Sequence, residues 1–181
     1  MTPTEYIDTF QLEHPGYSNY PQDYQPYIPL NKSRFLRIVK QGVINQELTE
    51  VIRSINEKQD WIIITEPWCG DAAQIVPYLF KMAELNPLIN VEVQLRDSNS
   101  EIDSYLSHGK MSIPKLIVRN QEGADRFVWG PRPKELETIY LELKNKNENI
   151  EDMKTILQKW YNEDKGRGIQ DEIMELIKVT R

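Results

Sequence analysis

The sequence contains a single cysteine, Cys69, and only two histidines in 181 residues. One thiol forms no intramolecular disulfide, and a zinc site made of several thiolates is excluded. Any sulfur chemistry must therefore use a thiol or disulfide from another molecule. The spacing of Cys, His and acidic residues also lacks the paired pattern of metal ligands, so we expect no metal and no cofactor.

Long apolar runs and an excess of positive charge are also missing. No stretch approaches the ~20 apolar residues that span a bilayer, and the first residues show neither the basic nor the apolar region of a signal peptide. The net charge of -6 gives no broad basic surface for phosphate groups. We therefore expect a cytoplasmic protein that binds neither nucleic acid nor membranes.

The composition and length indicate one globular core with extensions. Hydrophobic residues make up 39% of the chain and charged residues 28%. The length exceeds the common domain size of about 100–150 residues without reaching two full domains. We expect an N-terminal extension packed on the core over residues 1–47, a central domain over residues 48–145, and a helical C-terminal extension over residues 146–181.

Residues 1–30 hold five prolines and five tyrosines. This spacing of prolines argues against a long regular element in the segment. We expect it to drape over the core, because tyrosine rings pack one side against an apolar surface. A recognition strip made by the tyrosines is the alternative.

Apolar periodicity predicts the elements of the central domain. In chain order they are a helix from Asn45 to about Gln59, a buried strand at 61–65, a helix from about Cys69 to Asn86, a strand at 91–95, a short helix from Ser100 to Gly109, a hairpin of strands at 116–118 and 126–129, and a helix from Pro133 to about 145. Two more amphipathic helices follow over 150–160 and 169–177. This order predicts an α/β fold with a central mixed β-sheet sandwiched by helices.

Cys69 lies in the predicted turn between the buried strand and the next helix. Unpaired N–H groups and the positive end of the helix dipole favour an anion there, and the thiolate is the nucleophilic form of cysteine. Gly70 permits a close turn, and Trp68 is placed to shield one side of the sulfur. The position favours a catalytic thiol, although a lone cysteine also serves as a small buried hydrophobe.

The segment Trp68-Cys69-Gly70-Asp71-Ala72 resembles the Trp-Cys-Gly-Pro-Cys active site of thioredoxins, with three of five positions identical. Further matches lie at the helix-kinking proline (Pro77), the cis-proline loop (Ser112-Ile113-Pro114) and the glycine before the last helix (Gly130). The resemblance covers residues 50–145 and implies a thioredoxin fold. It further implies a cis Ile113-Pro114 bond beside Cys69 and a substrate-binding surface at Ile113, Pro114 and Gly130, with the Ile113 backbone free to pair with a substrate strand.

Two positions depart from the thioredoxin pattern. Ala72 stands in the place of the resolving cysteine, and Ile63 in the place of a buried aspartate. A mixed disulfide needs a second thiolate to release it, and Ala72 offers none. A buried carboxylate with no proton to move would only cost desolvation energy. The sequence therefore predicts no self-sufficient dithiol reductase.

Asp71 replaces the proline of the thioredoxin motif. Its charge either complements the dipole at the helix start or acts on the thiol. If Asp71 lies near the sulfur, it raises the pKa of Cys69 relative to a thioredoxin nucleophile, and Glu66 acts in the same direction.

Three further residues were considered for the site. Arg132 is expected to be a solvated loop residue; the alternative is an anion-binding group near Cys69, with Trp129 in the lining. His108 is expected at a helix end, with catalytic pairing to Cys69 as the alternative. His14 lies in the Pro/Tyr-rich tail.

Three functional hypotheses remain open on sequence alone. The leading one is a monothiol thiol-disulfide oxidoreductase, whose Cys69 forms mixed disulfides with protein or low-molecular-weight thiols and is released by an external thiol. The second is a redox-inert module that holds an extended peptide around Trp68, Ile113 and Pro114. The third is a homodimer linked through Cys69, which would be transient because cytoplasmic thiols are kept reduced.

Overall fold

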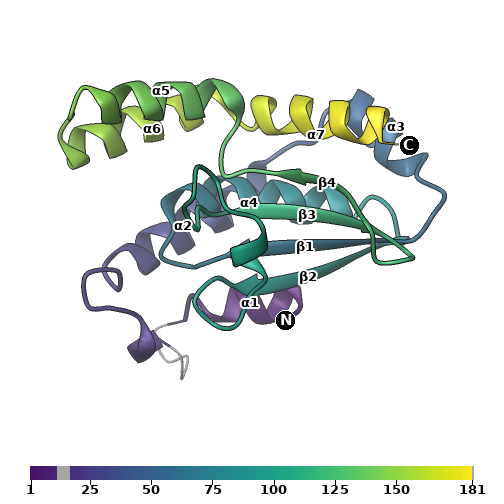
Figure 1. Cartoon of the computed structure of the whole chain (residues 1–181), viewed down its shortest axis with the longest axis horizontal. Helices are drawn as coiled ribbons and strands as arrows, with labels where there is room; N and C mark the ends of the chain where they lie inside the picture. Colours follow the sequence, from purple (N-terminus) through teal and green to yellow (C-terminus); the bar gives the residue numbers. More distant parts are fainter. Residues whose placement is uncertain (12–16, 181) are drawn as a thin grey trace.

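A computed structural model describes residues 1–11 and 17–180, so His14 lies outside the described residues. The strands of these residues form one sheet in the order β2-β1-β3-β4 (Figure 1). They are β1 (Gln59–Thr65), β2 (Ile89–Leu95), β3 (Lys115–Asn120) and β4 (Asp125–Trp129). β1 runs parallel to β2 and antiparallel to β3, which is antiparallel to β4. The predicted α/β class and mixed sheet are confirmed.

β1 is central because apolar side chains cover it on both faces. Trp61, Ile62, Ile63 and Ile64 are all buried, so water is excluded from both faces of the strand along this run. The helix that follows, α4 (Gly70–Ala83), lies behind the sheet in Figure 1 together with α2 (Tyr27–Gln41). The active-site motif of the sequence therefore joins the middle strand to a buried helix, as the pattern predicted.

The other helices frame this core. They are α1 (Pro3–Asp8), α3 (Gln46–Arg53), α5 (Lys134–Asn145), α6 (Ile150–Asp164) and α7 (Arg167–Val179), with short 3-10 turns η1 (Tyr17–Asn19) and η2 (Ile102–Ser104). Asn45 caps α3 as predicted, accepting the N–H of Leu48 at 2.8 Å. None of the helices in the described part of the chain is long and apolar enough to cross a membrane.

The N-terminal segment is joined to the core by buried aromatic residues. Tyr6 is fully buried in α1, and its hydroxyl lies 3.2 Å from that of Thr65 at the end of β1. The prolines of residues 1–30 argued against a long regular element, but α2 begins at Tyr27 within this stretch. Its N-cap is Pro26, and Pro29 lies in its first turn, where a helix needs no proline N–H. Prolines at those positions start a helix and do not prevent one.

Two predicted helix ends are wrong. α3 ends at Arg53, not near Gln59, because Gln59 already belongs to β1 and its N–H bonds the carbonyl of Leu88. The element after Ser100 is a single 3-10 turn that ends at Ser104, not a helix that reaches Gly109. His108 therefore lies exposed in a loop with a φ of 50°, not at a helix end.

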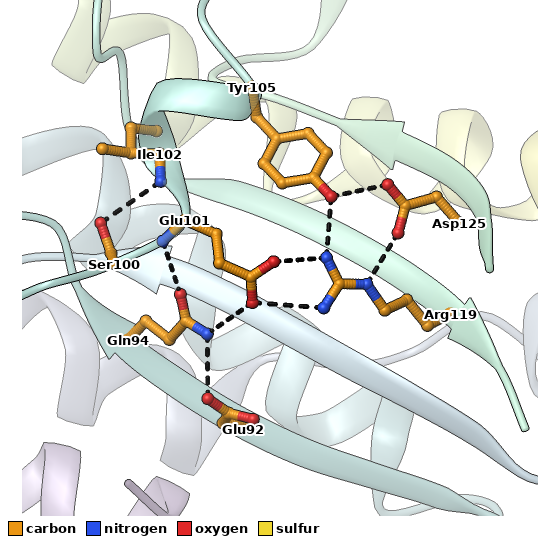
Figure 2. Close-up of polar contacts among 8 residues, drawn as sticks. All are labelled: Glu92, Gln94, Ser100, Glu101, Ile102, Tyr105, Arg119 and Asp125. Carbon is orange, nitrogen blue, oxygen red and sulfur yellow. Dashed lines mark hydrogen bonds and ion pairs between the residues drawn. The ribbon is translucent and has the colours of Figure 1, made fainter. Parts of the chain in front are cut away.

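One face of the sheet carries a polar network instead of a long helix. Register places Glu92, Gln94 and Arg119 on this face. Figure 2 shows the Arg119 guanidinium between the carboxylates of Glu101 and Asp125. The two ion pairs measure 2.5 and 2.7 Å, and the Tyr105 hydroxyl donates to Asp125 at 2.6 Å. This network fixes the segment around η2, which leads directly into the loop before Pro114.

The two C-terminal helices are confirmed, and they are attached in different ways. α7 buries five residues, among them Ile169 and Ile173, and packs against α3. No residue of α6 is fully buried. The boundaries proposed at residues 47 and 145 stay a prediction.

Candidate functional site

Cys69 is the N-cap residue of α4. Its sulfur accepts the N–H of Ala72 at 3.5 Å, and its thiol donates to the carbonyl of Ile113 at 3.5 Å. The Ile113-Pro114 bond is cis and lies beside Cys69, as the resemblance implies. The Cys69 thiol bonds the Ile113 carbonyl, which has a second lone pair, so pairing of the Ile113 backbone with a substrate strand stays a prediction.

The Cys69 thiol is held in its neutral form. Only 8% of the residue is exposed, and burial raises the pKa of Cys69 to about 12. The charge of Asp71 adds to this rise, while the Ala72 N–H and the Arg132 guanidinium act against it. The expectation of a favoured thiolate is therefore wrong, because desolvation outweighs the helix terminus. Asp71 acts in the expected direction, whereas Glu66 accepts the N–H of Asp97 at 2.9 Å.

A charged cluster surrounds the first turn of α4. Arg132 lies 2.7 Å from Asp71 and 2.7 Å from Glu137, and its guanidinium stacks over the Tyr140 ring at 4.0 Å. Asp71 also accepts the hydroxyl of Tyr161 at 2.8 Å. The Arg132 side chain is only 12% exposed, so the prediction of a solvated loop arginine is wrong. Its partners come from α4 and α5, which meet only in the folded chain.

The charge of Asp71 provides a direct test of what controls the thiol. Replacing Asp71 with asparagine removes the negative charge beside Cys69 and leaves Arg132 in place, so the pKa of Cys69 is expected to fall. Alkylation by iodoacetamide at pH 8 should become about tenfold faster, since one pKa unit changes the thiolate fraction tenfold. Asp60→Asn, an exposed change on β1, is the matched control. An unchanged pH profile in Asp71→Asn would contradict the assignment.

Trp68 is covered by two side chains distant in sequence. Tyr24 stacks on its ring with centroids 4.4 Å apart, and the Arg96 guanidinium lies 4.6 Å from the ring centroid. Its indole Nε1 is buried without a hydrogen-bond partner, as are Glu66 Oε2 and Arg132 Nε within the described residues. Buried polar atoms without a hydrogen-bond partner are uncommon in folded proteins. Glu66 and Trp68 precede Cys69 in the chain, and Arg132 contacts the neighbouring Asp71.

Gly130 and Pro114 are in very close contact. A Cβ at Gly130 would lie 2.3 Å from the Pro114 carbonyl oxygen, and the φ of Gly130 is 110°. The buried Lys115 fixes this contact by donating to the Gly130 carbonyl at 2.9 Å and to the Ser107 hydroxyl at 2.5 Å. Pro114 is buried and Ile113 is 6% exposed, so a substrate role for Ile113, Pro114 and Gly130 stays a prediction.

Three further residues singled out in the sequence are Ala72, Ile63 and Trp129. Ala72 and Ile63 are both fully buried, so aliphatic groups fill the places of the resolving cysteine and the acid. The Trp129 indole donates to Glu172 of α7 at 2.7 Å. In the described part of the chain, no group of three His, Cys, Asp or Glu residues is placed to hold a metal ion.

Sequence reasoning missed three residues of the site: Lys115, Glu137 and Tyr161. Lys115 carried a signal, because a lysine that opens an apolar strand is an uncommon buried charge. Burial lowers the pKa of this lysine, and the charge of Glu137 opposes that fall. Nothing in the sequence around Glu137 or Tyr161 indicates that these residues belong to the site.

The central strand, the single cysteine at the start of α4 and the opposed cis-proline together define a thioredoxin fold. The family model Thioredoxin_9, described as thioredoxin, matches residues 18–154. Since the match covers well over half of the chain, the protein belongs to that thioredoxin family. A comparison with curated proteins found no match.

Two solved structures share this fold over nearly the whole chain. One is a protein of unknown function, PA1234, from Pseudomonas aeruginosa, with a TM-score of 0.60, 14% identity, and coverage of 100% of this chain and 99% of that one. The other is an HIV 4E10 epitope scaffold, with a TM-score of 0.57, 15% identity, and 98% of each chain covered. At this level of identity the likeness shows the fold alone.

Proposed function

We propose that this protein is a redox-inert thioredoxin-fold module that binds a peptide or protein partner. The observation that carries the proposal is the state of the Cys69 thiol, which is buried and donates its proton to the Ile113 carbonyl. With its pKa raised to about 12, the thiolate fraction at pH 7 is about one in 10⁵. A disulfide in solution has neither access to the sulfur nor an anion to react with.

The residues that complete a dithiol cycle are also replaced. Ala72 has no sulfur to release a mixed disulfide, and the buried Ile63 moves no proton. Monothiol exchange through Cys69 would require the site to open first. These features support a binding role over the monothiol oxidoreductase that the motif alone favours.

The binding surface is proposed to be the exposed part of the loop before Pro114. Leu106 and Met111 are each 46% exposed, and Tyr24, which stacks on Trp68, is 37% exposed. Large apolar side chains at an exposed surface are typical anchors for a partner. The contact would use these neighbours of Ile113 and Pro114, because those two residues are themselves buried.

The reactivity of Cys69 tests the proposal. Iodoacetamide at pH 8 should alkylate the native protein at least 100-fold more slowly than the same chain in guanidinium chloride, where Cys69 has an ordinary pKa. Oxidised glutathione should form no mixed disulfide with the native protein, as read by intact mass. Cys69→Ser measures the background of both reactions. Equal native and unfolded rates, or rapid glutathionylation, would return the assignment to monothiol exchange.

A further inference from the structure

A cavity of about 310 Å³ lies between α2, α4 and the turn that joins α6 to α7. Its floor is apolar, since Ile38, Ile75 and Ile169 line it and are 6%, 1% and 2% exposed. The ring of Tyr78 contributes to the lining from α4. Concave sites of this size with mostly apolar walls are the usual form of small-molecule sites.

The wall formed by α6 contributes few apolar contacts. α6 has no fully buried residue and is joined to α2 and α4 by polar bonds: Gln158 with Gln74 at 3.1 Å, Asn162 with Arg37 at 3.4 Å, and Tyr161 with Asp71 at 2.8 Å. Protein interiors are normally filled to high density. An apolar hollow beside a helix held by polar bonds is thus a place where a ligand adds contacts that the chain does not make itself.

The charged groups of the lining favour an anion. The Arg37 guanidinium bonds only a neutral amide oxygen, and among the described residues no ion pair joins it to an acid. Asp164 is the acid of the lining, and its carboxylate accepts the N–H of Gly168 at 2.9 Å at the start of α7. Lys165 is the second cation in the lining. Asp164 is thus engaged by the backbone, while Arg37 has no acidic partner among residues 1–11 and 17–180.

We propose that this cavity binds a small monoanion with an apolar body, with a carboxylate as the charged group. The carboxylate would pair with Arg37, whose guanidinium matches it in a two-bond geometry. The hydrocarbon part would lie against Ile38 and the ring of Tyr78, above the more deeply buried Ile75 and Ile169. This site is separate from the surface around Leu106 and Met111, so it stands whether or not that surface binds a partner.

Titration of the ¹⁵N-labelled full-length protein with hexanoate tests the site. The backbone amides of Gly42 and Gly166, which line the cavity, should shift with saturation. Hexylammonium and 1-hexanol share the chain length of hexanoate but lack the negative charge, so both should bind at least tenfold more weakly. Arg37→Gln should weaken hexanoate binding at least tenfold, whereas Arg53→Gln, an exposed change on α3, should leave it unaltered.

Three results would overturn the proposal. The first is the absence of saturable shifts at Gly42 and Gly166. The second is equal affinity for hexanoate and hexylammonium, which would show nonspecific apolar binding. The third is unchanged hexanoate affinity in Arg37→Gln. Because Arg37 is exposed, that variant should fold, and its amide spectrum without ligand verifies this directly.

Discussion

Replacing Gly130 with alanine is expected to destabilise the protein by on the order of 4 kcal/mol, a large fraction of the roughly 5–15 kcal/mol by which native proteins are stable. The added Cβ would lie 2.3 Å from the carbonyl oxygen of Pro114, which is backbone and has no rotamer with which to move aside. The φ of 110° is also one that alanine rarely adopts. Steric overlap and backbone strain therefore act together at this position.

Gly123 is the matched control. It has a φ of 80° in the turn between β3 and β4, and no heavy atom lies within 4 Å of a Cβ placed there. Gly123→Ala should therefore cost only the backbone strain, about 1 kcal/mol. Guanidinium unfolding followed by circular dichroism compares the two variants. Equal losses in Gly130→Ala and Gly123→Ala would show that the contact with Pro114 is unimportant.

Replacing Glu66 with glutamine is expected to stabilise the protein at alkaline pH and to have little effect at acid pH. Glu66 is 1% exposed, and burial raises its pKa to about 7 from an ordinary value of 4.5, against the lowering effect of the Asp97 N–H bond. The folded state thus holds a proton that the unfolded state releases between these two values. The wild type therefore loses stability as pH rises from about 4.5 through 7, by about 3 kcal/mol in total.

Glutamine keeps the oxygen that accepts the Asp97 N–H but never ionises. The difference in unfolding free energy between Glu66→Gln and wild type should therefore rise from near zero at pH 4.5 to about 3 kcal/mol at pH 8.5. Glu122→Gln, an exposed change in the β3–β4 turn, should show no such trend. A difference that is constant with pH, or that grows toward acid, would rule out a buried neutral Glu66.

The elements that the sequence predicted well are those with local signals. The apolar run of β1, the stripe of α4 and the Asn45 cap each need only neighbouring residues, so periodicity was sufficient. The sequence pattern does not predict α2, because prolines usually break helices, although the N-cap accepts Pro26 and the first turn accepts Pro29. Whether a proline begins or breaks a helix depends on its position in that helix, which the local sequence pattern does not give.

The chemistry of the site could not be predicted from local signals. The sequence predicts a solvated Arg132, because its partners Asp71 and Glu137 belong to helices before and after its loop, and only the fold brings them together. The helix terminus at Cys69 was visible in the sequence, but the burial that outweighs it was not. The direction of the pKa shift at Cys69 depends on desolvation, which is a property of the whole packed structure.

The polar attachment of α6 has a consequence for how the protein unfolds. Because α6 buries no side chain completely, its separation from α2 and α4 would expose less apolar area than unfolding of the core, with the half-buried Tyr161 as its contact with the core cluster. The sensitivity of an unfolding step to denaturant, and its heat capacity change, both scale with newly exposed surface. Opening of α6 would therefore change a denaturation curve less than the unfolding of α7, which buries five residues, together with the sheet. Hydrogen exchange of the α6 amides is the observable that separates this local step from the global transition.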